Sequence, residues 1–146
     1  MNTTIAICAK CDTKNRIPAD KQHLKPKCGK CKAALDMTDY SVPVELNDAV
    51  FTDFINTAPF PIMVDFFSPT CGPCHMLAPT IETLAKKFSG RAIIAKLDTS
   101  RYQMTAARFQ IRGVPTIIFF KHGQVADQIT GAAPEQTLTQ MLNQLL

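Results

Sequence analysis

The stretch VDFFSPTCGPC, at residues 64–74, decides the expected fold. It continues an apolar run, Pro61–Phe67, that is typical of a buried strand. It ends in Cys71-Gly72-Pro73-Cys74, where the proline suits the first turn of a helix. Because apolar side chains then recur at helical spacing over 74–88, the stretch predicts a strand that leads directly into a helix.

On both sides of this stretch, predicted helices and strands alternate. Further helices are expected at 46–56 (capped by Asn47), 100–109 and 134–146. Further strands are expected at 92–97, 116–121 and 124–129. A turn at His122-Gly123 joins the last two strands into a hairpin. This order predicts an α/β domain whose parallel strands are linked by helices and whose final strands are antiparallel.

All six cysteines fall in C-x-x-C pairs, which begin at Cys8, Cys28 and Cys71. A secreted disulfide scaffold would scatter its cysteines along a short chain and would need an oxidising compartment. The first residues lack the charged and apolar regions of a secretory signal. The pairs therefore favour metal or redox chemistry in a reducing compartment, and we expect a cytoplasmic protein.

Residues 1–40 have few large apolar side chains, so we expect them to need a staple in order to fold. The first two pairs, Cys8/Cys11 and Cys28/Cys31, are separated by sixteen residues, a spacing that predicts a zinc site. Four thiolates around zinc form a closed, structural site. We therefore expect one structural Zn²⁺ per chain in a zinc ribbon over 1–40, followed by a second domain over 41–146.

Two alternatives to this zinc site stay open. The two pairs can instead be reduced thiols or disulfides. His23 lies between the pairs and can replace a ligand, although with four cysteines present we expect it at the surface.

The third pair stands where a helix begins, which gives its two thiols different roles. At a helix N-terminus, free backbone N–H groups and the helix dipole lower the pKa of a thiol. We therefore expect Cys71 to be the attacking thiolate and Cys74, inside the helix, to resolve the mixed disulfide. The alternative is half of another metal site, but the sequence offers no further pair to complete it.

Residues 64–74 resemble the active-site segment of the thioredoxin family. The resemblance continues through Pro79, Lys96-Leu97-Asp98, Ile111–Thr116, Phe120–Gly123 and Thr130–Ala132. With a zinc ribbon in front, the chain looks like the bacterial thioredoxin-2 type. The resemblance implies the α/β thioredoxin fold, a central mixed sheet flanked by helices, with a small N-terminal zinc ribbon.

The resemblance also implies roles for individual residues. Asp65 matches a buried aspartate that takes a proton from Cys74, and Lys96 matches a lysine near that carboxylate. Pro115 matches a cis-proline, with Val114 binding an extended substrate segment through its backbone. The further substrate-binding positions are Thr70, Gly72, Pro73, Gly131 and Ala132. A purely structural Asp65 and a trans Pro115 are the alternatives.

The chain departs from the family pattern beside the cysteines. It contains no Trp, whereas the family commonly has Trp at the positions of Phe67 and Thr70. Phe67 keeps the packing, but Thr70 removes an apolar contact at the edge of the substrate groove. His75 stands where the family often has Lys or Arg, and we expect it to be an exposed residue without a chemical role.

The function implied is that of a protein-disulfide reductase in electron transport. Its partners would be disulfide-containing proteins and an NADPH-dependent thioredoxin reductase. A disulfide oxidase or isomerase is the first alternative, but Gly72-Pro73 lacks the His between the cysteines that favours oxidation. The second alternative is a zinc-ribbon binding module that uses the rest of the chain as a scaffold.

Composition excludes other classes of protein. The apolar fraction of 46% is ordinary for a folded chain, and no apolar run approaches the roughly 20 residues that span a bilayer, so we expect no membrane association. The net charge of +4 is carried by residues 1–40, which hold eight Lys or Arg and four Asp. This surplus is too small to indicate nucleic-acid binding, and we expect a monomer.

Overall fold

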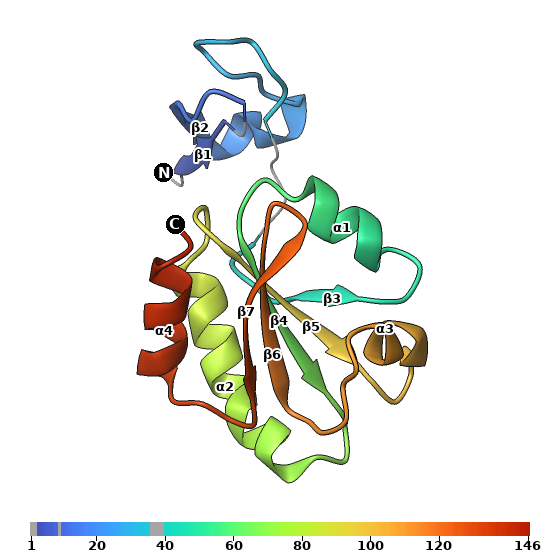
Figure 1. Ribbon diagram of the computed structural model, residues 1–146. Helices are drawn as coiled ribbons and strands as arrows, with labels where there is room; N and C mark the ends of the chain where they lie inside the picture. Colours follow the sequence, from blue (N-terminus) through green and yellow to red (C-terminus); the bar gives the residue numbers. More distant parts are fainter. Residues whose placement is uncertain (1–2, 9, 36–39) are drawn as a thin grey trace. The chain divides into compact units, whose positions relative to one another are not determined.

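The computed structural model describes residues 3–8, 10–35 and 40–146, without the side chains of Thr4, Ala19, Gln22 and His23. The expectation for the His23 side chain therefore lies outside the described residues. The chain divides into two compact units, Met1–Asp39 and Tyr40–Leu146, which we call the N-terminal unit and the larger unit (Figure 1).

The N-terminal unit is built on a short antiparallel hairpin. Strand β1 (Thr3–Ile7) pairs with β2 (Lys14–Pro18), and a 3-10 helix, η1 (Ala19–Leu24), follows. Its described core contains only five buried residues: Ala6, Cys8, Ile17, Cys28 and Leu35. Two of the five are cysteines, so this unit has little apolar surface with which to stabilise its fold.

The larger unit contains a five-stranded mixed sheet in the order β3-β5-β4-β6-β7. The strands are β3 (Val44–Leu46), β4 (Ile62–Phe67), β5 (Ile93–Asp98), β6 (Thr116–Lys121) and β7 (Gln124–Thr130). The first three lie parallel, β6 is antiparallel to β4, and β7 is antiparallel to β6. This arrangement confirms the mixed α/β sheet that the sequence predicts.

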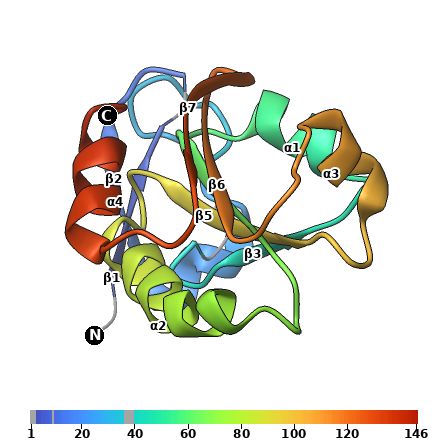
Figure 2. The ribbon, with the colours of Figure 1, turned by 60° about the horizontal axis from the view of Figure 1, so that its bottom comes forward.

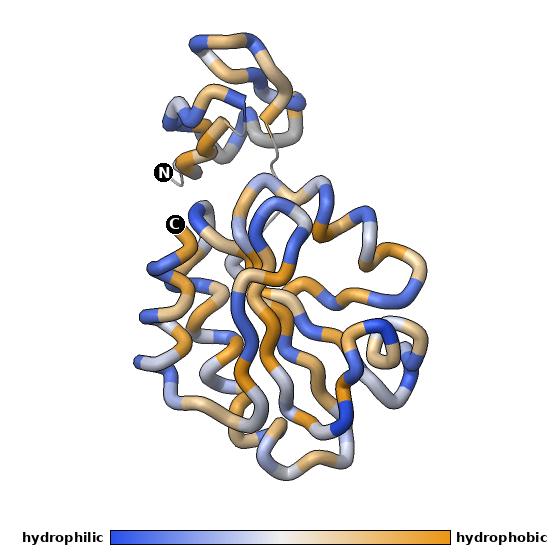
Figure 3. Tube along the Cα trace, viewed as in Figure 1, coloured by the Kyte–Doolittle hydropathy of each residue, from blue (hydrophilic) through white to orange (hydrophobic). Residues whose placement is uncertain are grey.

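Helices cover both faces of the sheet (Figures 1 and 2). One face carries α2 (Gly72–Lys87) and α4 (Glu135–Asn143), and the other carries α1 (Phe51–Thr57) and α3 (Gln103–Arg108). Successive residues of β4 alternate between these faces: Val64 and Phe66 belong to the α1 side, and Met63 to the α2 side. In Figure 3 the hydrophobic residues gather on the inner strands of the sheet, whereas β7 is more hydrophilic and largely exposed.

The turn between β6 and β7 lies at His122-Gly123, as predicted, and both residues have positive φ, 54° and 78°. A two-residue hairpin turn of type I′ requires this backbone conformation. At Gly123, a Cβ atom would also collide with Oδ1 of Asn56. The positive φ therefore favours glycine at this position, and a larger residue would also displace the exposed Asn56 side chain.

Several predicted bounds were wrong. The helix expected at 46–56 begins only at Phe51, because residues 48–50 form a turn in which Oδ1 of Asn47 accepts from the N–H of Val50 at 3.0 Å. Strand β3 was not predicted, since three residues are too few to show a period of two. The helices expected at 100–109 and 134–146 are shorter, at 103–108 and 135–143, whereas α2 already begins at Gly72.

Among the described residues, no helix is long and apolar enough to span a bilayer.

Candidate active site and metal-binding cysteines

Cys71 and Cys74 form a disulfide at the start of α2, with their Cα atoms 5.2 Å apart. Cys71 is the N-cap residue: its Sγ accepts a hydrogen bond from the backbone N–H of Cys74 at 3.1 Å. Gly72 and Pro73 are exposed, and Pro73 lies in the first turn, where its missing N–H costs nothing. The dithiol thus sits on the positive end of a helix of 16 residues.

The two sulfur-bearing residues differ in exposure. Cys71 is partly exposed, whereas Cys74 is buried, at 5% exposure. A thiolate must reach its target in order to attack, so only the Cys71 sulfur is placed to meet a disulfide from another protein.

A second backbone segment faces the Cys71 sulfur. The Val114–Pro115 peptide bond is cis, as the resemblance implies. Sγ of Cys71 lies 3.6 Å from the carbonyl oxygen of Val114. The carbonyl of Pro115 accepts from the N–H of Gly131 at 2.7 Å, which ties the end of β7 to this segment. Val114, Pro115 and Gly131 therefore lie together beside the disulfide, and Ala132, which follows Gly131, is exposed.

Asp65 lies in β4 with its side chain toward α2, on the same face as Met63. It is 4% exposed, and its Oδ1 has no hydrogen-bond partner among the described residues. Burial raises the pKa of Asp65 to about 7, and the positive charge of Lys96 opposes this rise. Asp65 and Cys74 line one cavity of about 200 Å³, large enough to hold water between them.

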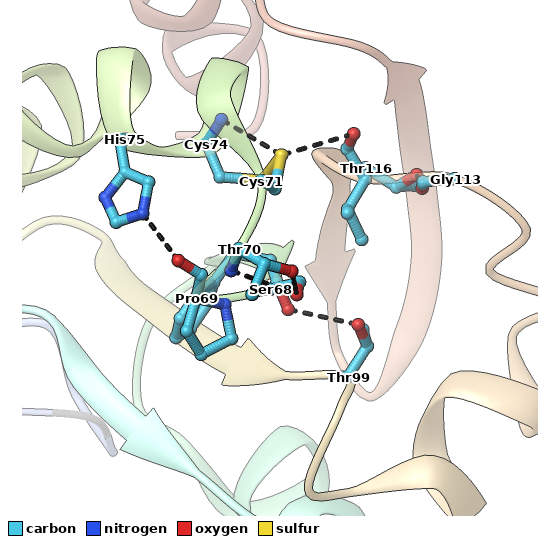
Figure 4. Close-up of a disulfide and its surroundings, with 11 residues drawn as sticks. Ser68, Pro69, Thr70, Cys71, Cys74, His75, Thr99, Gly113 and Thr116 are labelled. Carbon is cyan, nitrogen blue, oxygen red and sulfur yellow. Dashed lines mark hydrogen bonds between the residues drawn. A yellow bond between two sulfur atoms is a disulfide. The ribbon is translucent and has the colours of Figure 1, made fainter.

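The loop from β4 to α2 is fixed by polar contacts (Figure 4). Nε2 of His75 lies 2.6 Å from the carbonyl oxygen of Pro69, and the hydroxyls of Ser68 and Thr70 lie 3.2 Å apart. Thr99 donates to the carbonyl of Phe67 at 3.1 Å. The residues just before Cys71, which we call the rim, therefore carry the hydroxyl groups of Ser68 and Thr70. At the position of Thr70 the family commonly has an aromatic ring.

In the N-terminal unit, the other four cysteines meet in one cluster. The sulfur atoms of Cys8, Cys11, Cys28 and Cys31 all lie within 4.8 Å of one another. The sulfur of Cys8 is 3.5 Å from that of Cys31, and the sulfur of Cys11 is 3.6 Å from that of Cys28. Four thiolates around a zinc ion at about 2.3 Å would be about 3.8 Å apart, so the cluster fits tetrahedral zinc.

The chemistry of this cluster also fits a cation. Backbone N–H groups, that of Cys31 foremost, lower the pKa of Cys28 to about 6. The N–H of Ala33 acts in the same direction on Cys31, but burial and the neighbouring sulfur of Cys8 outweigh it and raise that pKa to about 11. Four sulfurs this close can all ionise only when a positive ion compensates their charge. The donor set is thus the one that zinc prefers.

The structure brings the sequence-predicted residues together in two places. The four N-terminal cysteines form one cluster, and Asp65 and Val114–Pro115 lie near the Cys71–Cys74 disulfide. Sequence reasoning missed the contact of His75 with the Pro69 carbonyl and the strand that contains Glu45. Glu45 between apolar Val44 and Leu46 follows the alternation of a strand, but three residues are too few to predict one.

Comparisons with known proteins agree with this geometry. The family model described as Thioredoxin matches residues 42–144, and the one described as Thioredoxin 2, N-terminal, matches residues 7–33. Thioredoxin C-3 of Corynebacterium nephridii is 35% identical over 142 residues, covering 97% of this chain and 95% of that protein.

Two further relatives match mainly the larger unit. The chloroplastic thioredoxin M-type of Spinacia oleracea is 38% identical over 116 residues, which cover 80% of this chain and 62% of that protein. A mutant thioredoxin from Halobacterium salinarum NRC-1 is a similar solved structure, with a TM-score of 0.63 and 30% identity. The alignment covers 74% of this chain and 94% of that one.

A disulfide-forming C-x-x-C pair at a helix start, the sheet order of the larger unit and both family matches lead to one assignment. The chain is a thiol–disulfide oxidoreductase that belongs to the thioredoxin family, of the thioredoxin-2 type.

Proposed function

We propose that the protein reduces disulfides in other proteins, with Cys71 as nucleophile and Cys74 as resolving thiol. One observation carries this proposal: a partly exposed sulfur caps α2, while its buried partner shares a cavity with a carboxyl group whose pKa is about 7. An exposed nucleophile, a sheltered second thiol and a nearby proton acceptor are what a two-step exchange requires.

The exchange balances two electrons and two protons. The Cys71 thiolate attacks one sulfur of the substrate disulfide, which breaks; the other substrate sulfur leaves and takes up a proton. The mixed disulfide is then attacked by the Cys74 thiolate at the Cys71 sulfur. The second substrate thiol leaves, and the Cys71–Cys74 disulfide remains, as in the structure. The substrate is reduced and the protein is oxidised.

Asp65 is proposed to take the proton from Cys74 before the second step. A carboxyl with a pKa of about 7 is ionised often enough near neutral pH to accept a proton, and basic enough to hold it. The cavity between the two side chains allows water to carry the proton. With Asp65→Asn, we expect the second exchange step to slow more than the first.

The substrate is proposed to lie along Val114–Pro115 as an added extended segment. Its backbone would bond to the Val114 backbone, whose carbonyl faces the Cys71 sulfur. Thr70, Gly72, Pro73, Gly131 and Ala132 would form the rest of the groove. The absence of a large side chain at Gly72, Gly131 and Ala132 leaves room for that segment.

The remaining assignments follow from the family. A NADPH-dependent thioredoxin reductase would return the disulfide to the dithiol, and protein disulfides would be the substrates. We propose that the protein is a cytoplasmic monomer with two domains, 1–40 and 41–146. Separate cores in the two units support the division, although Tyr40 packs against Phe60 in the larger one.

In the N-terminal unit, Cys8, Cys11, Cys28 and Cys31 would hold one zinc ion. Bound there, zinc would supply four bonds that cross-link the first two C-x-x-C pairs, and the small core offers no equivalent stabilisation. The hydroxyl of Thr13 lies 3.1 Å from Sγ of Cys11 and would help to hold this ligand in place. No open coordination position remains for chemistry when all four thiolates bind.

The test is the reduction of insulin disulfides in the presence of dithiothreitol, and separately with NADPH and thioredoxin reductase. Wild type should accelerate reduction in both assays, and Cys71→Ser in neither. Activity with dithiothreitol alone would support the reductase chemistry but contradict recycling by this reductase. Acceleration by Cys71→Ser equal to wild type would contradict the proposal as a whole.

A further inference from the structure

Three charged side chains lie in one row across the sheet of the larger unit. In the strand register, Glu45 of β3 is opposite Lys96 of β5, and Lys96 is opposite Asp65 of β4. Residues in register on adjacent strands point to the same face of a sheet. All three therefore point toward the α2 face, and the row continues with apolar Ile117 on β6.

Exposure falls along this row from the sheet edge to its centre. The side chain of Glu45 is 79% exposed and that of Lys96 is 30% exposed, whereas Asp65 is 4% exposed. Lys96 thus stands between a carboxylate in water and a carboxyl group in the interior. One ammonium group has two acidic neighbours that compete for it.

In the structure, Lys96 pairs with the outer carboxylate. Its Nζ lies 3.5 Å from Oε1 of Glu45 and 5.9 Å from the centroid of the Phe67 ring. Within the described part of the chain, it makes no ion pair with Asp65, whose Oδ1 has no partner. Lys96 therefore acts on the buried carboxyl only through its charge, at a distance, and opposes the rise in the pKa of Asp65.

We propose that Glu45 is a positioning residue that, by holding Lys96 toward the sheet edge, sets how readily Asp65 takes and returns a proton. The proposal rests on the proposed role of Asp65 in releasing the mixed disulfide. When Lys96 is held outward, Asp65 stays the stronger base. When Lys96 turns inward, the ionised form of Asp65 is stabilised and the carboxyl becomes a weaker base.

Other charged groups around Asp65 must be separated from this effect. The same cavity is lined by Cys74, His75 and Glu82 from α2, besides Lys96 from β5. From β6, the residue opposite Asp65 is the apolar Ile117. Glu82 offers a matched control, because it is an exposed carboxylate on the cavity wall and makes no ion pair with Lys96 among the described residues.

The experiment is a ¹³C NMR titration of the Asp65 carboxyl carbon in the oxidised full-length protein. In this state Cys71 and Cys74 form the disulfide and do not titrate, and no catalytic activity is needed. Glu45→Gln should lower the pKa of Asp65 by about half a pH unit, the scale of an exposed ion pair. Glu82→Gln should produce a clearly smaller shift. Because Glu45 is exposed at a sheet edge, its substitution leaves the core unchanged.

A double-mutant cycle identifies Lys96 as the intermediary. In a Lys96→Met background, the pKa of Asp65 should rise, and Glu45→Gln should then have almost no further effect. An equal shift with and without Lys96 would overturn the proposal, since Glu45 would then act only through space. No shift, or an upward shift, from Glu45→Gln in the wild-type background would overturn it as well.

The kinetic counterpart is the pH profile of the second exchange step. Because the base must be ionised, Glu45→Gln should move the acidic limb of this profile to lower pH. At pH 6 the step should be roughly twofold to threefold faster than in wild type. A moved NMR titration with an unmoved profile would contradict the role of Asp65 in the proposed function but leave the coupling through Lys96 intact.

Discussion

The two units of this chain place the same short motif in different surroundings. In the N-terminal unit, each C-x-x-C pair lies in a turn of a unit with a small core, and four sulfurs converge. In the larger unit, the single pair lies at the start of α2, above two extensive hydrophobic clusters. A C-x-x-C pair alone therefore does not distinguish the proposed metal binding from redox exchange, and the backbone and the other cysteines around it make the difference.

The units also differ in what stabilises them. The larger unit buries aromatic and aliphatic side chains on both faces of its sheet, among them Phe66 and Leu84. The described core of the N-terminal unit has no aromatic residue, and two of its five buried residues are cysteines. Loss of a metal should therefore affect one unit only, and a buried charge in the sheet should affect the other.

The largest expected effect is that of removing zinc from the N-terminal unit. A structural zinc site contributes about 10–16 kcal/mol of binding free energy in small domains, far more than this core can supply. Cys28→Ser, or chelation of the wild type, should abolish amide protection over 3–35 and leave protection over 40–146 unchanged. Hydrogen exchange with zinc analysis measures both.

Lys30→Ala is the matched control for that substitution. Lys30 is exposed and lies between Cys28 and Cys31. Its backbone N–H contacts Sγ of Cys28, and alanine keeps this group. This variant should retain zinc and protection. An N-terminal unit that stays protected after complete zinc removal would show that its apolar core suffices.

A smaller effect should come from the buried carboxyl of the larger unit. Asp65 in the folded protein has a pKa of about 7, whereas an unfolded aspartate loses its proton near pH 4. This group therefore favours folding fully below about pH 4, and the advantage is lost as the pH rises to about 7. Three units of pKa correspond to about 4 kcal/mol.

Asp65→Asn should remove this dependence. Relative to wild type, the free energy of unfolding of the variant should increase by up to about 4 kcal/mol between pH 4 and pH 8. Denaturant titrations followed by NMR signals of the larger unit measure the difference, with Glu82→Gln as an exposed carboxylate control. A constant difference across this range would mean that Asp65 titrates normally.

The smallest expected effect concerns the rim beside Cys71. Thr70 is exposed, and its hydroxyl faces that of Ser68, so the rim offers little apolar contact. Thr70→Trp should raise kcat/KM for a peptide disulfide flanked by leucine by up to about tenfold, through added apolar contact. The gain for the same peptide flanked by serine should be smaller.

Thr70→Val is the matched variant for that measurement, because it keeps the shape of threonine and removes only the hydroxyl. Its change in the leucine-to-serine preference should have the same sign as that of Thr70→Trp and be smaller. Equal gains for both peptides with Thr70→Trp would show that the rim does not select substrates.

Much of this organisation could be predicted from the sequence, because cysteine spacing and hydrophobic periodicity are local signals. The strand–helix transition at 62–87 and the four-cysteine cluster follow from such patterns. The start of α1 was misjudged because Asn47 caps a turn that precedes the helix. The strand–helix transition and the start of α1 each depend on a few residues that are close in sequence.

Contacts between distant segments could not be predicted in the same way. The pairing of Glu45 with Lys96 depends on β3 lying beside β5. A strand of three residues is too short for this neighbour to be predicted from the sequence. The proximity of the Cys71 sulfur to Val114 was available only through the family resemblance, since 43 residues separate them. Register between strands, and not propensity, creates these parts of the site.

We propose that the Cys71–Cys74 pair exchanges disulfides, whereas the two N-terminal pairs do not. It is tested most directly by exposing the zinc-loaded Cys74→Ser variant to a labelled peptide disulfide and mapping the adduct by mass spectrometry. We expect a single, persistent mixed disulfide on Cys71 and none on Cys8, Cys11, Cys28 or Cys31. An adduct on the N-terminal cysteines that forms as fast as the one on Cys71, or full turnover by this variant, would contradict it.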